Sequence, residues 1–219
     1  MLDNILISIE GNIGVGKSTF IDILQKNIDN SDFVDEPIDI WLNIKDDKGL
    51  NILQAFYDDK TRWSYTFQNL AYVSRMQSIE EKIRSSNKKF IFLDRSLDTD
   101  KNIFAKMLQE DGFINNLEIE IYNYWCNFYN KFIRPSNKRN IIYLRSSPDI
   151  AYNRIIKRNR TEELKISQEY INKLHEYHEK WLFNNTTDNV LILDCNKDFE
   201  NDLNHQQELL EQVIKFIKN

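Results

Sequence analysis

Cysteine, proline, glycine and long apolar runs are all scarce in this chain of 219 residues. Its only cysteines, Cys126 and Cys195, lie far apart in the sequence, which argues against a disulfide framework and against a zinc site. We expect both to be buried thiols in a reducing compartment. No apolar run approaches the roughly 20 residues that a membrane-spanning helix needs, and the N-terminus shows no signal-peptide pattern. We therefore expect a cytoplasmic protein without a membrane partner.

Positive charge is not in excess either. The 29 basic and 34 acidic side chains leave a net charge of -5, whereas a protein that coats nucleic acid usually presents a basic surface. We therefore expect no nucleic-acid partner. The length of the chain and its hydrophobic content of 41% suffice for the core of one sizeable domain, which we expect to span residues 1–219.

Three of the five glycines fall in one stretch of the chain, between an apolar run at residues 5–9 and an apolar segment that starts at Phe20. This stretch consists of Gly11, Asn12, Ile13, Gly14, Val15, Gly16, Lys17, Ser18 and Thr19. It matches the pattern G-x-x-x-x-G-K-[ST] between a strand and a helix, in which backbone N–H groups and the helix N-terminus surround phosphate oxygens. We expect Lys17 to contact the β- and γ-phosphates and Ser18 to hold Mg²⁺. The stretch predicts a nucleoside triphosphate site, and the alternative is a glycine-rich turn that binds nothing.

Four later segments are short and apolar at consecutive positions, which is typical of parallel strands that helices cover on both faces: residues 32–34, 90–93, 140–144 and 190–193. Long segments with helical spacing lie between them, such as residues 62–84, 100–108 and 117–132. This alternation predicts an α/β fold with a doubly wound, five-stranded parallel sheet and helices on both faces. Ligands of such sheets bind beyond the carboxyl ends of the strands.

Glu36 and Trp41 follow the second predicted strand. Pro37 restricts Glu36 to an extended backbone, so the carboxylate lies on a shaped loop. A carboxylate near the γ-phosphate could accept a proton from an attacking hydroxyl, and Trp41 could supply a flat apolar wall. A surface acid before a turn and a tryptophan of the core explain the spacing equally well.

The predicted helix at residues 62–84 places Gln68, Ala71 and Arg75 on one face. A glutamine and an arginine on either side of a small residue could read the polar edge of a nucleobase, for which the alanine leaves room. The alternative is a solvated helix face. Arg75 could also pair with Asp100, which carries the opposite charge.

Asp94 and Arg95 follow the third predicted strand. An acid at the end of an apolar strand is the expected partner for a metal near Ser18. The planar guanidinium of Arg95 could hold a phosphate or a catalytic carboxylate.

Three arginines cluster beyond the fourth predicted strand: Arg154, Arg158 and Arg160. In an acidic protein such a cluster suggests an anion clamp, acting as a mobile lid over the triphosphate. The alternative is an exposed basic helix end that the helix dipole favours. After the last strand, Asp198 and Phe199 lie where a nucleotide base could rest.

Together these residues resemble the deoxyribonucleoside kinase family, in particular its deoxycytidine, deoxyguanosine and deoxyadenosine kinase branch. The matching segments follow one another over nearly the whole chain, at residues 11–19, 36–41, 62–68, 94–96, 100–105, 154–163, 174–182 and 196–199. The resemblance implies a P-loop kinase fold with an arginine-rich lid at about residues 154–166. It also implies ATP as the phosphate donor, Mg²⁺, a deoxynucleoside as the acceptor and a homodimer.

The resemblance also implies roles for the acceptor site. Glu36 matches the base at the 5′-hydroxyl, Arg95 matches the arginine beside it, and Lys17 completes the catalytic set. Gln68 matches the residue that hydrogen-bonds the nucleobase, between the apolar walls Trp41 and Phe104. The pair that holds the sugar 3′-hydroxyl corresponds to Tyr57 and Glu163.

On the donor side, Arg154, Arg158 and Arg160 match the lid arginines, and Asp198 with Phe199 matches the cradle of the donor base. Arg75 and Asp100, beside the small Ala71, resemble the branch that accepts deoxycytidine and deoxypurine nucleosides, so we expect thymidine to be a poorer substrate. Three positions depart from the family pattern, of which Val15 is a mild variation within the phosphate loop. Asp94 stands where many relatives have glutamate, and Asn159 stands where a glycine is common, which is expected to stiffen the lid.

The implied function is the ATP-dependent phosphorylation of the 5′-hydroxyl of a deoxyribonucleoside. A deoxynucleoside monophosphate kinase shares the sheet and the loop, but it must neutralise an acceptor phosphate and has no need for a carboxylate at the attacking atom. Glu36 therefore favours the nucleoside, whereas Arg95 suits either acceptor. A nucleotide-binding switch or interaction protein is a further alternative, in which the clamp, the base and the sugar site would all be idle.

Overall fold

The computed structural model describes residues 4–133, 138–160, 166–183 and 185–218. The chain forms two compact units. We call the first the sheet unit, which comprises Met1–Asp35, Lys82–Arg95 and Lys138–Asn219. The second is the helical unit, which comprises Glu36–Glu81 and Ser96–Asn137. The expectation that residues 1–219 form one domain stays a prediction.

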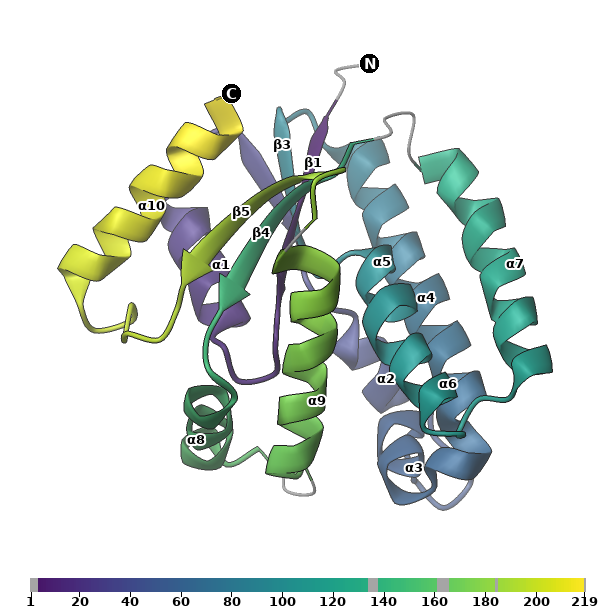
Figure 1. The fold of residues 1–219 in the computed structure, drawn as a ribbon. Coiled ribbons are helices and arrows are strands. Elements are labelled where there is room, and N and C mark those ends of the chain that lie inside the picture. The colour runs from purple at the N-terminus through teal and green to yellow at the C-terminus, as the bar shows by residue number, and fades with distance from the viewer. Residues whose placement is uncertain (1–3, 134–137, 161–165, 184, 219) are drawn as a thin grey trace. The chain divides into compact units, whose positions relative to one another are not determined.

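In its described residues, the sheet unit contains five strands: β1 (Ile5–Gly11), β2 (Ser31–Val34), β3 (Phe90–Asp94), β4 (Asn140–Arg145) and β5 (Asn189–Asp194). All neighbouring strands are parallel, and their order is β2-β3-β1-β4-β5 (Figure 1). The phosphate-loop sequence therefore leaves the central strand of the sheet. This confirms the predicted five-stranded parallel sheet.

The helices of the sheet unit are α1 (Lys17–Asn27), α8 (Pro148–Arg158), α9 (Gln168–His178), the π-helical turn η3 (Glu179–Phe183) and α10 (Leu203–Lys218). Alternate strand positions face opposite sides of the sheet. On one side, Ile9 and Ile142 pack with Leu24 of α1 and Leu209 of α10. On the other side, Tyr143 packs with Leu182 of η3. Both faces of the sheet are thus covered, which explains why the strands are apolar at consecutive positions.

The helical unit contains α2 (Ile38–Asn43), α3 (Ile52–Asp58), most of α4 (Lys60–Ser85), α5 (Leu97–Thr99), the π-helical turn η1 (Asp100–Ala105), α6 (Lys106–Glu110) and α7 (Asn116–Ile133). Tyr72 joins the two long helices, because its ring contacts those of Tyr122 and Tyr129 and its hydroxyl donates to the carbonyl of Cys126 at 3.2 Å. Figure 1 shows α4 and α7 side by side. The helices predicted at residues 62–84 and 117–132 are confirmed.

Within the described ranges, no helix combines the length and the apolar composition that a membrane crossing requires.

Candidate active site

The loop between β1 and α1 contains glycines at positions where a side chain would clash with neighbouring atoms. Gly16 has a φ of 103°, and a Cβ placed on it would lie 2.7 Å from Cζ of Phe199. Gly14 has a φ of 79°, and a Cβ on it would collide with the carbonyl oxygen of Ala151 in α8. Both the backbone conformation and the available space therefore require glycine at these positions. The loop lies against α8 and against the segment that contains Phe199.

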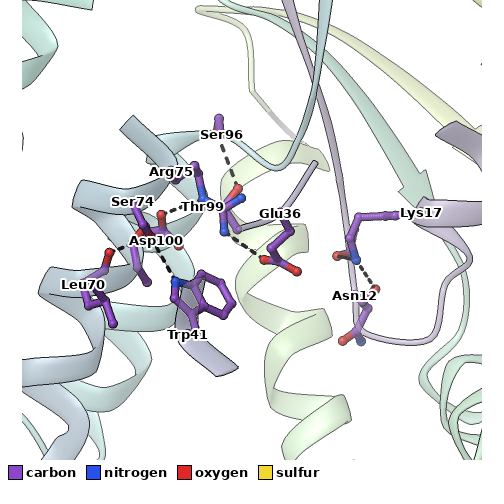
Figure 2. Close-up of polar contacts among 12 residues, drawn as sticks. Asn12, Lys17, Glu36, Trp41, Leu70, Ser74, Arg75, Ser96, Thr99 and Asp100 are labelled. Atoms are coloured by element: carbon purple, nitrogen blue, oxygen red, sulfur yellow. Dashed lines mark hydrogen bonds and ion pairs between the residues drawn. The ribbon is translucent and has the colours of Figure 1, made fainter. Parts of the chain in front are cut away.

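Lys17 and Asn12 hold the loop from within (Figure 2). The Nζ atom of Lys17 donates to the carbonyls of Gly11 at 3.1 Å and of Asn12 at 3.0 Å. The Asn12 side chain donates to the carbonyl of Ile171 in α9 at 2.9 Å and accepts from the N–H of Ile13 at 2.9 Å. No acid lies in the first turn of α1, so the positive end of the helix dipole stays available to an anion. The arrangement suits the binding of phosphate groups.

Arg154 of α8 connects the phosphate loop to the segment after β5. Its two terminal nitrogens donate to the carbonyl of Val15 at 3.0 Å and to the carbonyl of Lys197 at 3.1 Å. Its guanidinium also lies 5.9 Å from the centre of the Phe199 ring. The structure therefore brings together three of the elements that the sequence analysis assigned to the donor nucleotide.

The remaining candidate lid residues lie at and beyond the C-terminal end of α8. Arg158 and Arg160 are exposed at the end of α8, and Glu163 lies outside the described residues, as does most of the segment from 161 to 166. Asn159 closes α8 with φ 52° and ψ 46°. This is the left-handed conformation that glycine usually supplies at a helix end, and asparagine is one of the few other residues that adopt it readily.

Asp198 builds the turn that carries Phe199. Its carboxylate accepts the N–H of Glu200 at 2.9 Å, the N–H of Asn201 at 3.2 Å and the side-chain amide of Asn201 at 2.8 Å. The bond from the Asn201 side chain is the main reason why the pKa of Asp198 is lowered. Phe199 itself is buried, with its ring edge-on to that of Phe20 at 5.7 Å. A donor base in this region would meet a preformed turn.

Asp94 and Arg95 lie at the carboxyl end of β3, and both are buried. Arg95 has a φ of 66°, which is unusual for a residue with a side chain, and its N–H donates to the carbonyl of Ile9 at 3.1 Å. Strained backbone of this kind is concentrated at functional sites. The conformation directs the chain abruptly out of the sheet immediately after the carboxylate.

The residues assigned to Mg²⁺ have suitable chemistry. The Ser18 hydroxyl and the Asp94 carboxylate are hard oxygen donors, which Mg²⁺ prefers. Among the described residues, no group of three or more His, Cys, Asp or Glu side chains is arranged to hold a metal by itself. Mg²⁺ in phosphate-transfer sites commonly takes one or two protein ligands and completes its shell with phosphate oxygens and water, so this pair fits such an ion.

In the helical unit, Arg75 of α4 joins two carboxylates (Figure 2). Its Nη2 atom lies 2.8 Å from Oε1 of Glu36, and its Nε atom lies 2.9 Å from Oδ2 of Asp100. The side chains of Arg75 and Asp100 are each 2% exposed, and that of Glu36 is 16% exposed. Burial acts to lower the pKa of Arg75, but the two acids raise it overall. The guanidinium is therefore permanently charged. We call these three residues the Glu36–Arg75–Asp100 triad.

The helix face that contains Gln68, Ala71 and Arg75 is buried rather than solvated. The Oε1 atom of Gln68 is buried and has no hydrogen-bond partner among the residues that the structure describes. A buried polar atom without a partner is costly, because it has lost its hydration. An incoming N–H donor would remove this cost, and Ala71 beside it adds little bulk.

Trp41 packs against the same helix. Its Nε1 donates to Oγ of Ser74 at 3.0 Å (Figure 2). Its ring lies 5.2 Å from that of Phe67. Ser74 in turn donates to the carbonyl of Leu70 at 2.7 Å. No sequence motif singled out Ser74. Its position directly before Arg75 was the only signal available.

The two remaining aromatic candidates are partly buried. Tyr57 lies in α3, where its ring contacts that of Phe56 at 5.2 Å, and Phe104 lies in η1. Each is accessible enough to contact a ligand.

His178 is a buried titratable group that sequence reasoning left without a role. Its Nδ1 lies 2.7 Å from the carbonyl of Leu174, and its ring is stacked on that of Tyr143 at 5.9 Å. Burial lowers the pKa of His178 to about 3. The imidazole is therefore neutral at physiological pH, with Nδ1 as the donor.

Comparison with known proteins adds independent information. A family model described as deoxynucleoside kinase matches residues 7–218. The chain is 40% identical over 215 residues to a probable deoxycytidine kinase of fowlpox virus. This alignment covers 96% of this chain and 87% of the viral protein. It is 38% identical over 237 residues to deoxycytidine kinase 2 of Gallus gallus, and 35% identical over 235 residues to a mitochondrial deoxyguanosine kinase of Xenopus laevis. Each of these two alignments covers 96% of this chain and 89% of the relative.

Proposed function

This chain belongs to the deoxynucleoside kinase family, and from this premise we propose that it transfers the γ-phosphoryl group of ATP to the 5′-hydroxyl of a deoxycytidine or deoxypurine nucleoside. It is a phosphotransferase with an alcohol group as acceptor. One observation carries the choice of an uncharged acceptor. The Glu36–Arg75–Asp100 triad contains two carboxylates and one guanidinium, and this excess of negative charge disfavours an acceptor that already carries a phosphate.

The sheet unit supplies the donor side. The N–H groups of the phosphate loop and Lys17 bind the triphosphate, and Lys17 gives up its carbonyl partners for phosphate oxygens. Arg154, together with Arg158 and Arg160, forms a lid at about residues 154–166, and Asp198 with Phe199 supports the donor base. Ser18 and Asp94 would hold Mg²⁺, which when bound neutralises charge on the phosphates.

A second set of residues binds the acceptor. Glu36 accepts the proton of the 5′-hydroxyl, and Arg95 with Lys17 stabilises the charge on the transferred group. Tyr57 binds the sugar 3′-hydroxyl together with Glu163. The remaining contacts are made to the nucleobase by Gln68 and by the apolar walls Trp41 and Phe104.

Base preference follows from hydrogen-bonding capacity. Oδ1 and Oδ2 of Asp100 can only accept hydrogen bonds when the carboxylate is ionised. Cytosine, adenine and guanine carry an exocyclic amino group that donates, and thymine carries none. A carboxylate that accepts from an exocyclic amino group disfavours a pyrimidine that presents a carbonyl oxygen at the same position, as thymine does. Thymidine is therefore expected to be the poorest of the four deoxynucleosides.

The test is one ATP-consumption assay across the four deoxynucleosides and their monophosphates. The proposed function requires ADP release that depends on a deoxynucleoside. Activity only with monophosphates would instead support a deoxynucleoside monophosphate kinase. ATP binding without any acceptor-dependent turnover would support a nucleotide-binding switch.

We also propose that two copies of this chain associate through α7. Among the side chains of α7 that the structure describes, five large apolar ones are exposed, and their spacing places them along one face of the helix: Leu117, Ile121, Tyr124, Trp125 and Phe128. Val73 of α4, the helix beside α7, is exposed as well. An exposed apolar patch of this kind marks an interaction surface, and a second copy of the same face is a complementary partner.

Light scattering coupled to size-exclusion chromatography tests this association. Trp125→Glu should convert a dimer into a monomer. Leu203→Glu is the matched control, because Leu203 is an exposed apolar residue of α10 in the other unit. A monomeric wild-type protein, or a Trp125→Glu variant that remains dimeric, would contradict the proposal.

A cytoplasmic location stays a prediction. Both cysteines are free and buried, which suits a reducing compartment. Fractionation of cells that express the protein would check it.

A further inference from the structure

Arg75 has two roles to reconcile. The proposed function uses it, with Asp100, to recognise the nucleobase. In the structure, Nη2 of Arg75 also lies 2.8 Å from Oε1 of Glu36, the carboxylate that accepts the proton (Figure 2). An arginine that only recognised a base would need one carboxylate to balance its charge, and Asp100 already supplies it.

The geometry distinguishes the functions of the two acids. Asp100 contacts Nε and Glu36 contacts Nη2, which are different nitrogens of one rigid planar group. Asp100 is the more deeply buried of the two acids. It therefore anchors the guanidinium, and the guanidinium in turn fixes the direction of the more exposed Glu36 carboxylate.

We propose that Arg75 is a positioning residue for Glu36, so that it contributes to the rate of phosphoryl transfer with every accepted base. This inference rests on the proposed function, because it takes Glu36 as the group that accepts the proton. Oε1 of Glu36 is the oxygen that Arg75 engages. One oxygen is thus fixed by a charge-assisted bond, and the carboxylate cannot rotate away from the hydroxyl without breaking it.

The size of the expected effect follows from general experience with enzymes. General base catalysis contributes about 10²–10⁴-fold, and a misplacement of about 1 Å costs about 10²-fold. Loss of Arg75 should therefore lower kcat by about 10- to 100-fold, and by no more than the loss of Glu36 itself.

A double-mutant cycle separates positioning from base recognition. We expect Arg75→Met to lower kcat by a similar factor for deoxycytidine and for deoxyguanosine. In a Glu36→Gln background the same substitution should change kcat by less than about 3-fold, because residues that act as one unit are non-additive. The proposal would be overturned if the kcat losses of the two single substitutions multiplied in the double variant, or if Arg75→Met changed only KM.

Gln68→Leu is the matched comparison. Gln68 lies on the same buried helix face as Arg75, and its Oε1 atom has no hydrogen-bond partner among the described residues. If Gln68 only reads the base, its loss should raise KM to an extent that depends on the base. If Arg75→Met gave this same pattern, Arg75 would be a recognition residue only.

Folding is controlled by thermal unfolding of each variant, because Arg75→Met leaves Asp100 buried beside an apolar side chain. Should that variant not fold, Arg75→Lys serves in its place, since it keeps the positive charge but lacks the planar fork that spans both acids. It should also lower kcat with both nucleosides and show no further effect in the Glu36→Gln background. A kcat equal to that of the wild type would overturn the proposal.

The inference and the proposed function fail in different ways. Absence of deoxynucleoside-dependent turnover in the wild-type protein would refute the function. If the wild-type protein were fully active but the kcat losses of Arg75→Met and Glu36→Gln multiplied in the double variant, only the positioning role would be refuted.

Discussion

The indole N–H of Trp41 donates to the hydroxyl of Ser74, a residue 33 positions away on α4. The bond is 3.0 Å long and buried. It fixes the loop helix α2, which directly follows Glu36 and Pro37, to the helix that carries Gln68 and Arg75. A small hydroxyl thus links the candidate apolar wall to the candidate base-reading face.

Ser74→Ala should destabilise the protein, because it leaves a buried indole N–H without its acceptor. A loss of about 1–3 kcal/mol in the free energy of unfolding is expected, measured by urea denaturation. Ser78→Ala is the control, since Ser78 lies one turn along the same helix and its hydroxyl donates to the backbone carbonyl of Ser74 at 3.1 Å. Equal losses in the two variants would contradict this assignment.

Gly16→Ala should weaken ATP binding and lower stability. The left-handed backbone costs a residue with a Cβ about 1–2 kcal/mol, and the new methyl group would also lie 2.7 Å from Phe199. Gly49→Ala isolates the backbone cost, because Gly49 has a φ of 85° and no neighbour within 4 Å of its added Cβ among the described residues. Titration with ATP and thermal unfolding should therefore show the larger effects at Gly16. Similar behaviour of the two variants would exclude a packing role for Gly16.

Glu36→Gln should lower kcat with deoxycytidine by about 10²–10⁴-fold, because an amide cannot accept the proton of the 5′-hydroxyl. The KM for ATP should change little. Glu81→Gln, an exposed change on α4, is the control for loss of one negative charge. Near-normal turnover of a folded Glu36→Gln variant would remove Glu36 from the proposed role.

His178→Phe should flatten the acid side of the stability profile. The folded pKa of about 3 lies below the ordinary value of 6.5, so the unfolded chain binds a proton before the folded protein does. Between about pH 6.5 and pH 3 this difference lowers the free energy of unfolding by about 1.4 kcal/mol per pH unit. It has no effect above pH 7. Denaturant unfolding at pH 7, 6, 5 and 4 should give a wild-type slope that is steeper than that of the variant, and parallel slopes would show that His178 is not protonated on unfolding.

The phosphate loop, the five strands and the long helices follow from local sequence. Each depends on residues that are close in the chain: glycines that permit tight turns, consecutive apolar residues that form covered strands, and helical spacing of apolar side chains. Such patterns predict which element forms and which chemistry its residues can perform. They predicted the parallel sheet and placed the candidate residues after its strands.

Tertiary structure alone decided how side chains from distant segments combine. Glu36 and Arg75 are 39 positions apart, and Arg75 and Asp100 are 25 apart. The sequence allowed the Arg75–Asp100 pair but contained no sign of the bond from Arg75 to Glu36. The sequence also did not predict the burial of Gln68 or the contact between Trp41 and Ser74. Which acid meets which guanidinium depends on the packing of whole helices, because a hydrogen bond requires a precise distance and direction that no local pattern specifies.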